Sequence, residues 1–298
     1  MLRSVPTFFA AVTLTLAGCA ADEAALVPSP SADESAGAAT AILNAGVSAN
    51  LGSGDAPAKF LFDPLYDDHF GSLQKLSPDL IQRIVGGAPP YDGVTAVFVS
   101  HAHGDHFSET HLARMLTAQP QLQLVAPQQA VERLRGSDLW EESFAARVIG
   151  IALENGEQSD TFEIAGATVE AFRSPHSGWP DRHAEVHNLT FRVSTISPAP
   201  QRSGEIAFWR VMHLGDADPG AEYFVPHRKF LSRSRTGLAI VPFWFLNTDD
   251  PESLVGMTLN SESAVGMHVP AREPGWLAGS GWDYFTGEGQ QVPVPEVP

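Results

Sequence analysis

One short segment, Ser100-His101-Ala102-His103-Gly104-Asp105-His106, constrains this chain more than any other. It directly follows residues 94–99, an apolar and β-branched run that predicts a buried strand. The first two histidines lie two positions apart and project to the same side of an extended chain. The glycine permits a turn that directs the aspartate and the last histidine elsewhere. One loop can therefore supply two ligands to one metal ion and two to a second. Imidazole and carboxylate ligands suit zinc, iron or manganese.

The run His-Ala-His-Gly-Asp-His resembles the His-X-His-X-Asp-His signature of the metallo-β-lactamase-fold hydrolases. The resemblance covers about residues 58–270 and implies an α/β fold, an αββα sandwich of two mixed sheets with helices outside. It also implies two divalent transition-metal ions at one edge of the sandwich, zinc first, with iron or manganese as alternatives. The ligands that it implies are His101, His103 and His176 for the first ion, Asp105, His106 and His268 for the second, and Asp216 as the bridge.

Polar residues of ligand type recur at the ends of apolar runs, which supports a shared site. His176 is preferred as the third histidine because it comes soon after the predicted strand 168–173; the alternatives are His183 and His187. His187 precedes the predicted strand 188–193, where it could face the substrate instead. Asp63 ends a predicted strand, and the resemblance implies that it supports the metal ligands from behind. The alternative for Asp63 is a simple Asp-Pro turn.

The composition limits the partners of the chain. Its 298 residues, 43 % of them hydrophobic, are enough for one large α/β domain. It has 18 Lys and Arg against 35 Asp and Glu, a formal net charge of −17. Such a surface repels phosphate backbones, so no nucleic-acid partner is expected. Arg173 and Arg182 are the cations near the predicted site in sequence, and Arg173 is expected to contact a small-molecule or lipid-like substrate.

The chain begins with a pattern typical of exported proteins. A positively charged start precedes an apolar stretch that is too short to span a bilayer. Leu16-Ala17-Gly18-Cys19 then resembles the bacterial lipobox, which implies cleavage before Cys19 and lipidation of its thiol. We therefore expect a signal peptide at 1–18, a disordered tether at 19–45, the hydrolase domain at 46–288 and a loose Pro-rich tail at 289–298. The expected location is the cell envelope, with a membrane contact through the lipid anchor and no protein partner.

The implied metals predict the chemistry. A metal-bound water falls in pKa from 15.7 to about 7 and yields a hydroxide at neutral pH. Asp105 and Asp216 are the predicted catalytic carboxylates, and a Gly-X-Ser-X-Gly nucleophile motif is absent. The layout is most similar to lactonase-like and N-acyl-phosphatidylethanolamine phospholipase-like members. Hydrolysis of an ester, lactone or phosphodiester is therefore expected. The alternatives are a β-lactamase and a non-catalytic metal-binding lipoprotein.

Overall fold

Two β-sheets packed face to face form the centre of the computed structural model, which describes residues 36–52, 58–198 and 206–298. The first sheet has the order β14-β1-β2-β3-β4-β5-β6. Its pairs are antiparallel from β14 to β3 and parallel from β3 to β6, so the sheet is mixed. The strands are β1 (Ala38–Leu43), β2 (Gly46–Asn50), β3 (Lys59–Phe62), β4 (Val94–Phe98), β5 (Gln123–Pro127), β6 (Val148–Ile151) and β14 (Gln291–Pro293).

The second sheet has the order β13-β12-β11-β10-β9-β8-β7, and β15 pairs with β10 off this path. The pairs from β7 to β10 are antiparallel, whereas those from β10 to β13 are parallel. The strands are β7 (Phe162–Ile164), β8 (Ala167–Arg173), β9 (Leu189–Ile196), β10 (Phe208–His213), β11 (Thr236–Pro242), β12 (Ser261–Met267), β13 (Asp283–Tyr284) and β15 (Glu296–Val297).

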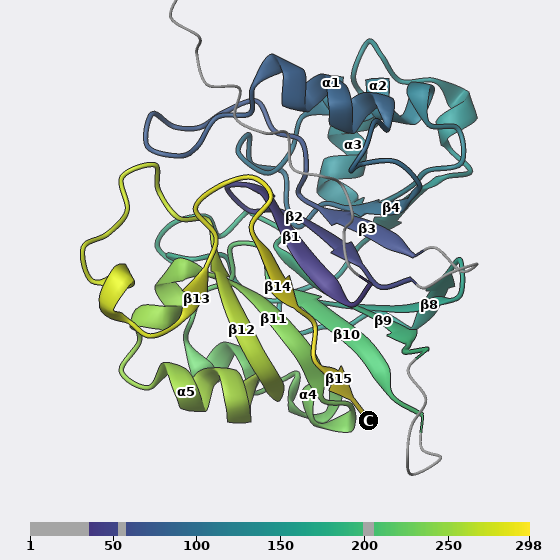
Figure 1. Cartoon of the computed structure of the whole chain (residues 1–298). Helices are drawn as coiled ribbons and strands as arrows, with labels where there is room; N and C mark the ends of the chain where they lie inside the picture. Colours follow the sequence, from purple (N-terminus) through teal and green to yellow (C-terminus); the bar gives the residue numbers. More distant parts are fainter. Residues whose placement is uncertain (1–35, 53–57, 199–205) are drawn as a thin grey trace, which may run out of the picture. The chain divides into compact units, whose positions relative to one another are not determined.

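The helices cover the outer faces of the two sheets (Figure 1). Helices α1 (Pro78–Gly86), α2 (Glu109–Ala118) and α3 (Gln128–Arg135) share one apolar cluster with the first sheet. Helix α4 (Arg228–Arg233) and the short turns around α5 (Pro251–Ser253) share another with the second sheet. Ser77 caps α1 by accepting a hydrogen bond from Leu80 N. The short helical segments are η1 (Glu142–Phe144), η2 (Ala221–Phe224), η3 (Phe243–Asn247), η4 (Leu254–Thr258) and η5 (Leu277–Gly279).

A third apolar cluster lies between the sheets and joins them. Phe98 of β4 packs on Phe62 of β3 and on Phe191 of β9, each with 5.1 Å between ring centroids. All three rings are fully buried, and burial of such a side chain stabilises a fold by about 1.5–3 kcal/mol. Helices outside, two mixed sheets inside and three apolar layers confirm the predicted αββα sandwich.

The folded domain is longer at both ends than the predicted bounds of 46–288. Strand β1 begins at Ala38, inside the predicted tether, and pairs with both β2 and β14. The predicted loose tail supplies β14 and β15, which pair with β1 and β10. Backbone pairing therefore orders segments whose composition predicted disorder. The predicted signal peptide, Cys19 and the first part of the tether lie outside the described residues. No helix in the described part of the chain has the length and apolarity needed to cross a membrane.

Candidate metal centre

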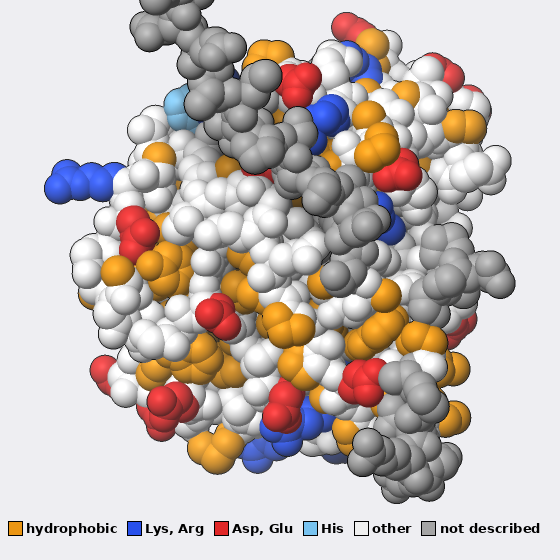
Figure 2. All heavy atoms as spheres, in the orientation of Figure 1, with side chains coloured by type: hydrophobic (Ala, Val, Ile, Leu, Met, Phe, Trp, Pro, Cys, Tyr) orange, Lys and Arg blue, Asp and Glu red, His pale blue; other side chains and the backbone are white. Residues whose placement is uncertain are grey.

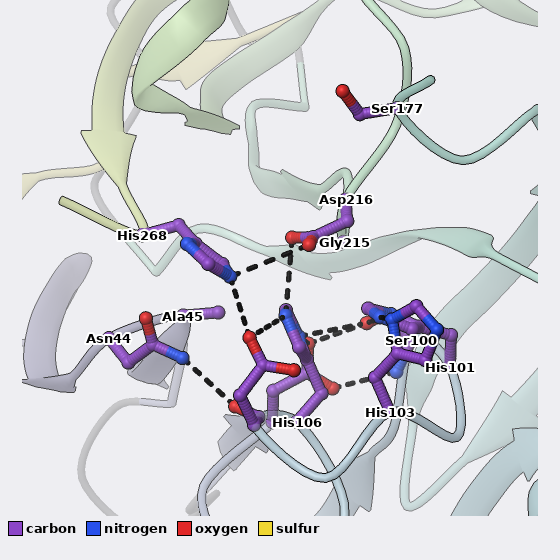
Figure 3. A network of polar contacts seen from close by, with 12 residues as sticks. Asn44, Ala45, Ser100, His101, His103, His106, Ser177, Gly215, Asp216 and His268 are labelled. Carbon is purple, nitrogen blue, oxygen red and sulfur yellow. Dashed lines mark hydrogen bonds and ion pairs between the residues drawn. The ribbon is translucent and has the colours of Figure 1, made fainter. Parts of the chain in front are cut away.

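The structure brings all seven predicted ligands to one edge of the sandwich, where β4, β8, β10 and β12 end. They form two groups, and within each group the ligand atoms lie within 4.8 Å of one another. In the first group, His101 Nε2 and His103 Nδ1 are 3.1 Å apart. In the second, His268 Nε2 lies 3.0 Å from Asp105 Oδ2, and His268 points toward His106 and Asp216 (Figure 3). The groups are His101, His103 and His176, and Asp105, His106, Asp216 and His268.

Asp216 touches both groups, which is the position that the resemblance implies for a bridge. Its Oδ1 lies 3.2 Å from His106 Nε2, and its Oδ2 lies 3.4 Å from His268 Nε2 in the same group. The same Oδ2 lies 3.6 Å from His176 Nε2 of the other group. The glycine before it adopts a positive φ of 56°, and a Cβ there would meet Asn188 Oδ1 at 2.3 Å. Only glycine therefore lets the chain turn Asp216 inward at this point.

Several atoms of the centre lack the partners that buried polar atoms normally have. His106 Nε2, His176 Nε2 and Asp216 Oδ1 are buried and have no hydrogen-bond partner. The other nitrogen of His176 lies 3.0 Å from Ser177 O, so Nδ1 carries the proton and Nε2 keeps a free lone pair. Unpaired nitrogen and oxygen atoms that converge in this way fit divalent metal ions of the zinc type.

Asp63 lies behind the ligands and contacts them through hydrogen bonds. Its carboxylate is fully buried and accepts hydrogen bonds from Ser100 N at 2.7 Å, Ser100 Oγ at 2.6 Å and His106 Nδ1 at 2.8 Å. Ser100 Oγ also lies 3.0 Å from His101 Nδ1. One carboxylate thus orients a histidine of each group and directs the Nε2 of each toward the other ligands of its group. Asp63 has a φ of +43°, an unusual value for a residue other than glycine, at the point where the chain leaves β3.

The β1–β2 turn also supports the centre, a role that sequence reasoning missed. Asn44 Nδ2 donates to Asp105 O at 2.9 Å, and Asn44 O accepts from His268 N at 2.9 Å. His213 Nε2 lies 2.9 Å from Ala45 O. Asn44 adopts a φ of +54°, a conformation that Asn tolerates well in turns. The available signal was Asn-Ala-Gly after an Ala-rich run, but its first two residues fell within the tether predicted at 19–45.

Arg133 connects residues 100–107, which we call the metal-binding loop, to helices α2 and α3. It projects from α3, donates to Ala102 O, and forms hydrogen bonds with Glu109 at the start of α2. Its guanidinium carbon lies 5.1 Å from the centroid of the Phe107 ring. Ala102 lies between two ligands and Phe107 directly follows a third. Arg133 therefore restrains the loop from both ends.

Burial and charge divide the histidines of the centre by protonation state. Burial lowers the pKa of His101 well below its usual value and that of His103 to about 4, so both are neutral at pH 7. Burial also opposes a charge on His106, but the carboxylates of Asp216, Asp105 and Asp63 outweigh it and raise its pKa. The pKa values of Asp105 and Asp216 are lowered despite burial, chiefly by His106. Without metal, the second group is thus an ion cluster.

The predicted substrate contacts need correction. Arg173 is buried beneath the neighbouring loop, where it donates to Leu153 O at 2.8 Å and pairs with Glu154 at 3.5 Å. His187 lines an acidic hollow of about 390 Å³ with Glu154. Arg173 therefore faces the segment after β6, and His187 faces that segment and α3. His183 lies at the centre instead, with its ring centroid 5.1 Å from His103 and 4.7 Å from that of His176.

Comparison with solved structures finds proteins of similar architecture at low sequence identity. Igni18, a metallo hydrolase from Ignicoccus hospitalis, is 14 % identical over 86 % of this chain and 97 % of its own, with a TM-score of 0.48. A putative metal-dependent hydrolase from Parabacteroides distasonis is 16 % identical over 85 % and 93 %, with a TM-score of 0.48. An isothiocyanate hydrolase from Delia radicum gut bacteria is 14 % identical over 86 % and 98 %, with a TM-score of 0.49.

Comparison with curated proteins finds no significant match. The model of the beta-lactamase superfamily domain matches residues 58–223, which is more than half of the chain. The match includes β3, the whole metal-binding loop, His176 and Asp216. On this match, the chain belongs to the beta-lactamase superfamily.

Proposed function

We propose that this metallo-hydrolase cleaves an ester, lactone or phosphodiester bond in a small or lipid-like substrate at the two ligand groups. The observation that carries the proposal is the pair of groups sharing Asp216, with unpaired buried atoms on His106, His176 and Asp216 itself. Convergent buried nitrogen and oxygen atoms of this kind are typical of metal-binding functional sites.

Each ligand group would hold one divalent ion, with zinc favoured by the nitrogen-rich first group. When bound, the ions supply Lewis acidity and lower the pKa of water from 15.7 to about 7. The side chains of the protein orient the ligands. Asp63 accepts a hydrogen bond from His106 Nδ1 and so fixes the tautomer of His106, and Asp216 would be held by ions of both groups. Asp105 and Asp216 stay ionised because neighbouring histidines lower their pKa values.

The charge of the chain favours a small substrate. The formal net charge is −17, and Figure 2 shows Asp and Glu side chains scattered among apolar side chains on one face. The negative charges of such a surface repel a long polyanion along its whole length. A compact ester or diester needs to contact only the metal centre. RNA and DNA are therefore expected to be poor substrates.

Metal analysis followed by a substrate screen tests the proposal. Protein purified without added metal should contain close to two transition-metal ions per chain. It should hydrolyse at least one of nitrophenyl acetate, a simple lactone and bis(nitrophenyl) phosphate faster than single-stranded RNA. His103→Ala should lower the metal count and abolish turnover, whereas His69→Ala, outside both groups, should change neither. Full activity of His103→Ala would refute the site.

The same screen separates the alternatives. Preferred turnover of a chromogenic β-lactam would make the protein a β-lactamase. Two bound ions without turnover of any substrate would favour a non-catalytic metal-binding lipoprotein. Faster cleavage of RNA than of the small diester would overturn the charge argument.

We also propose that the protein is anchored in the cell envelope by lipid on Cys19. Leu16-Ala17-Gly18-Cys19 supports this proposal, together with the charged and apolar residues before it.

A further inference from the structure

Three neighbouring parallel strands end at the metal centre, and the middle one delivers aromatic rings instead of ligands. Strand β10 leads to Asp216 and β12 leads to His268. Strand β11 lies between them and ends at Pro242, directly before Phe243 and Trp244 of η3. The carboxyl ends of adjacent parallel strands meet at one sheet edge, so these rings lie between two metal ligands.

Trp244 contacts the loops on both sides. Its Nε1 donates to Ala217 O at 3.1 Å, next to Asp216. Its ring lies 5.4 Å from the ring of His268, at an interplanar angle of 64°. The single donor of the indole is therefore paired with the backbone, and the rest of the ring offers apolar surface beside the centre.

The apolar surface continues outward from Trp244. Phe243 lies 5.4 Å from Trp244, and Trp276, from the loop after β12, stacks on Phe243 at 6.2 Å and 22°. All three rings are only half-buried, although they pack on the apolar cluster beneath the second sheet. We call Phe243, Trp244 and Trp276 the aromatic wall.

We infer that the aromatic wall binds an apolar alkyl or acyl chain of the substrate, whose polar head lies at the metal centre. This inference rests on the proposed function and narrows the substrate class to amphiphilic molecules. The argument for this occupant is continuity, because the wall starts against the ligand His268 and extends by successive ring contacts from Trp244 through Phe243 to Trp276. Phe243 has no polar atom, and the donor of Trp244 is used, so these two rings favour hydrocarbon over a sugar or peptide.

Binding of alkyl phosphonates tests the inference without relying on turnover. The phosphonate head mimics a hydrolysed ester or diester at the centre, and the alkyl chain probes the wall. We would measure Kd of methyl, butyl and octyl phosphonate by calorimetry on the metal-loaded full chain. Burial of about two methylene groups corresponds to roughly tenfold in Kd, so octyl phosphonate should bind at least tenfold more tightly than methyl phosphonate.

Variants of the wall should reduce this preference. Phe243→Ala and Trp276→Ala should each lower the octyl-to-methyl ratio at least threefold, and Trp276→Phe should restore most of it. Trp140→Ala is the matched control, because Trp140 packs on Phe144 beneath the first sheet. If Phe243→Ala does not fold, Trp276→Ala still decides the question.

Failure of the inference and failure of the proposed function give different results. Equal binding of all three phosphonates, or a ratio that survives both Ala variants, would refute the wall and leave hydrolysis untouched. Chain-length-dependent binding with no turnover of any ester, lactone or diester would refute the proposed function and keep the wall.

Discussion

Replacement of Asp63 by Asn gives the sharpest test of how the centre is held. The carboxylate accepts three hydrogen bonds, two from Ser100 and one from His106 Nδ1. The amide keeps one acceptor oxygen, which can still serve Ser100 N. Its NH₂ group then faces Ser100 Oγ and His106 Nδ1, where it must donate. His106 would therefore move its proton to Nε2, the atom that is free to bind metal in the native tautomer.

The expected loss follows from these contacts. Each hydrogen bond to a charged group contributes about 1.5–3 kcal/mol, and 1.4 kcal/mol corresponds to tenfold in affinity. Loss of the bond from His106 should thus weaken metal binding at the second group about 10–100-fold, in the range known for residues that orient metal ligands. The first group should lose less, because Asp63 reaches His101 only through Ser100.

Competition with a chromophoric chelator, followed by metal analysis of the dialysed protein, measures both affinities. Asp63→Asn should release one ion at chelator concentrations that leave the native protein with two. Asp138→Asn is a matched control, since Asp138 is exposed and distant in sequence from the centre. Unchanged affinity of Asp63→Asn for both ions would refute the role of Asp63 as the residue that orients His106.

Four further predictions follow from the structure and the sequence. His176→Ala should cost one metal ion by elemental analysis, whereas His187→Ala should cost none; the reverse would contradict the ligand assignment. Arg133→Met should weaken metal binding severalfold in chelator competition because it frees both ends of the metal-binding loop, and Arg133→Lys should recover part of the loss. Cys19→Ser should move the protein from the membrane to the soluble fraction or leave it unprocessed; equal membrane association would argue against lipidation. Burial lowers the pKa of His227 to about 4 from 6.5, so its contribution to stability is lost as pH falls below 6.5; between pH 7 and 5 the native protein should lose about 2 kcal/mol more than His227→Gln in denaturant titrations.

The features that were predictable from the sequence are those that local pattern determines. The run before the metal-binding loop is apolar and β-branched, and it forms β4. The ligands at the ends of β10 and β12 follow similar runs. Strand β1 has the sequence Ala-Ala-Thr-Ala-Ile-Leu, in which three of six residues are alanine, a poor strand former, so pairing with β2 and β14 decides its conformation.

Side-chain direction was not predictable, because it depends on partners far away in the chain. Arg173 and His176 are three residues apart, yet Arg173 faces Glu154 while His176 faces Asp216. His183 reaches the centre although His187 is closer to a predicted strand. The backbone of His183 has a φ of +60°, which reverses the direction of the chain within the loop that follows His176. Contacts of the loop with the segment around Asp216 determine this turn. The hydrophobic periodicity of the sequence does not predict it.

The metal centre and the surface of the whole chain both carry an excess of negative charge. Among the described residues, Asp63, Asp105 and Asp216 surround His106, and the neutral His101 and His103 offset none of their charge. Buried carboxylates are costly unless a cation compensates them, so the same cluster that is unfavourable alone favours divalent ions. The formal charge of −17 adds to this field, since it attracts cations and repels polyanions. We therefore propose that the acidic surface and the buried acidic centre act together to favour divalent cations over nucleic acid. The half-buried apolar rings beside His268 then provide binding energy that does not depend on charge.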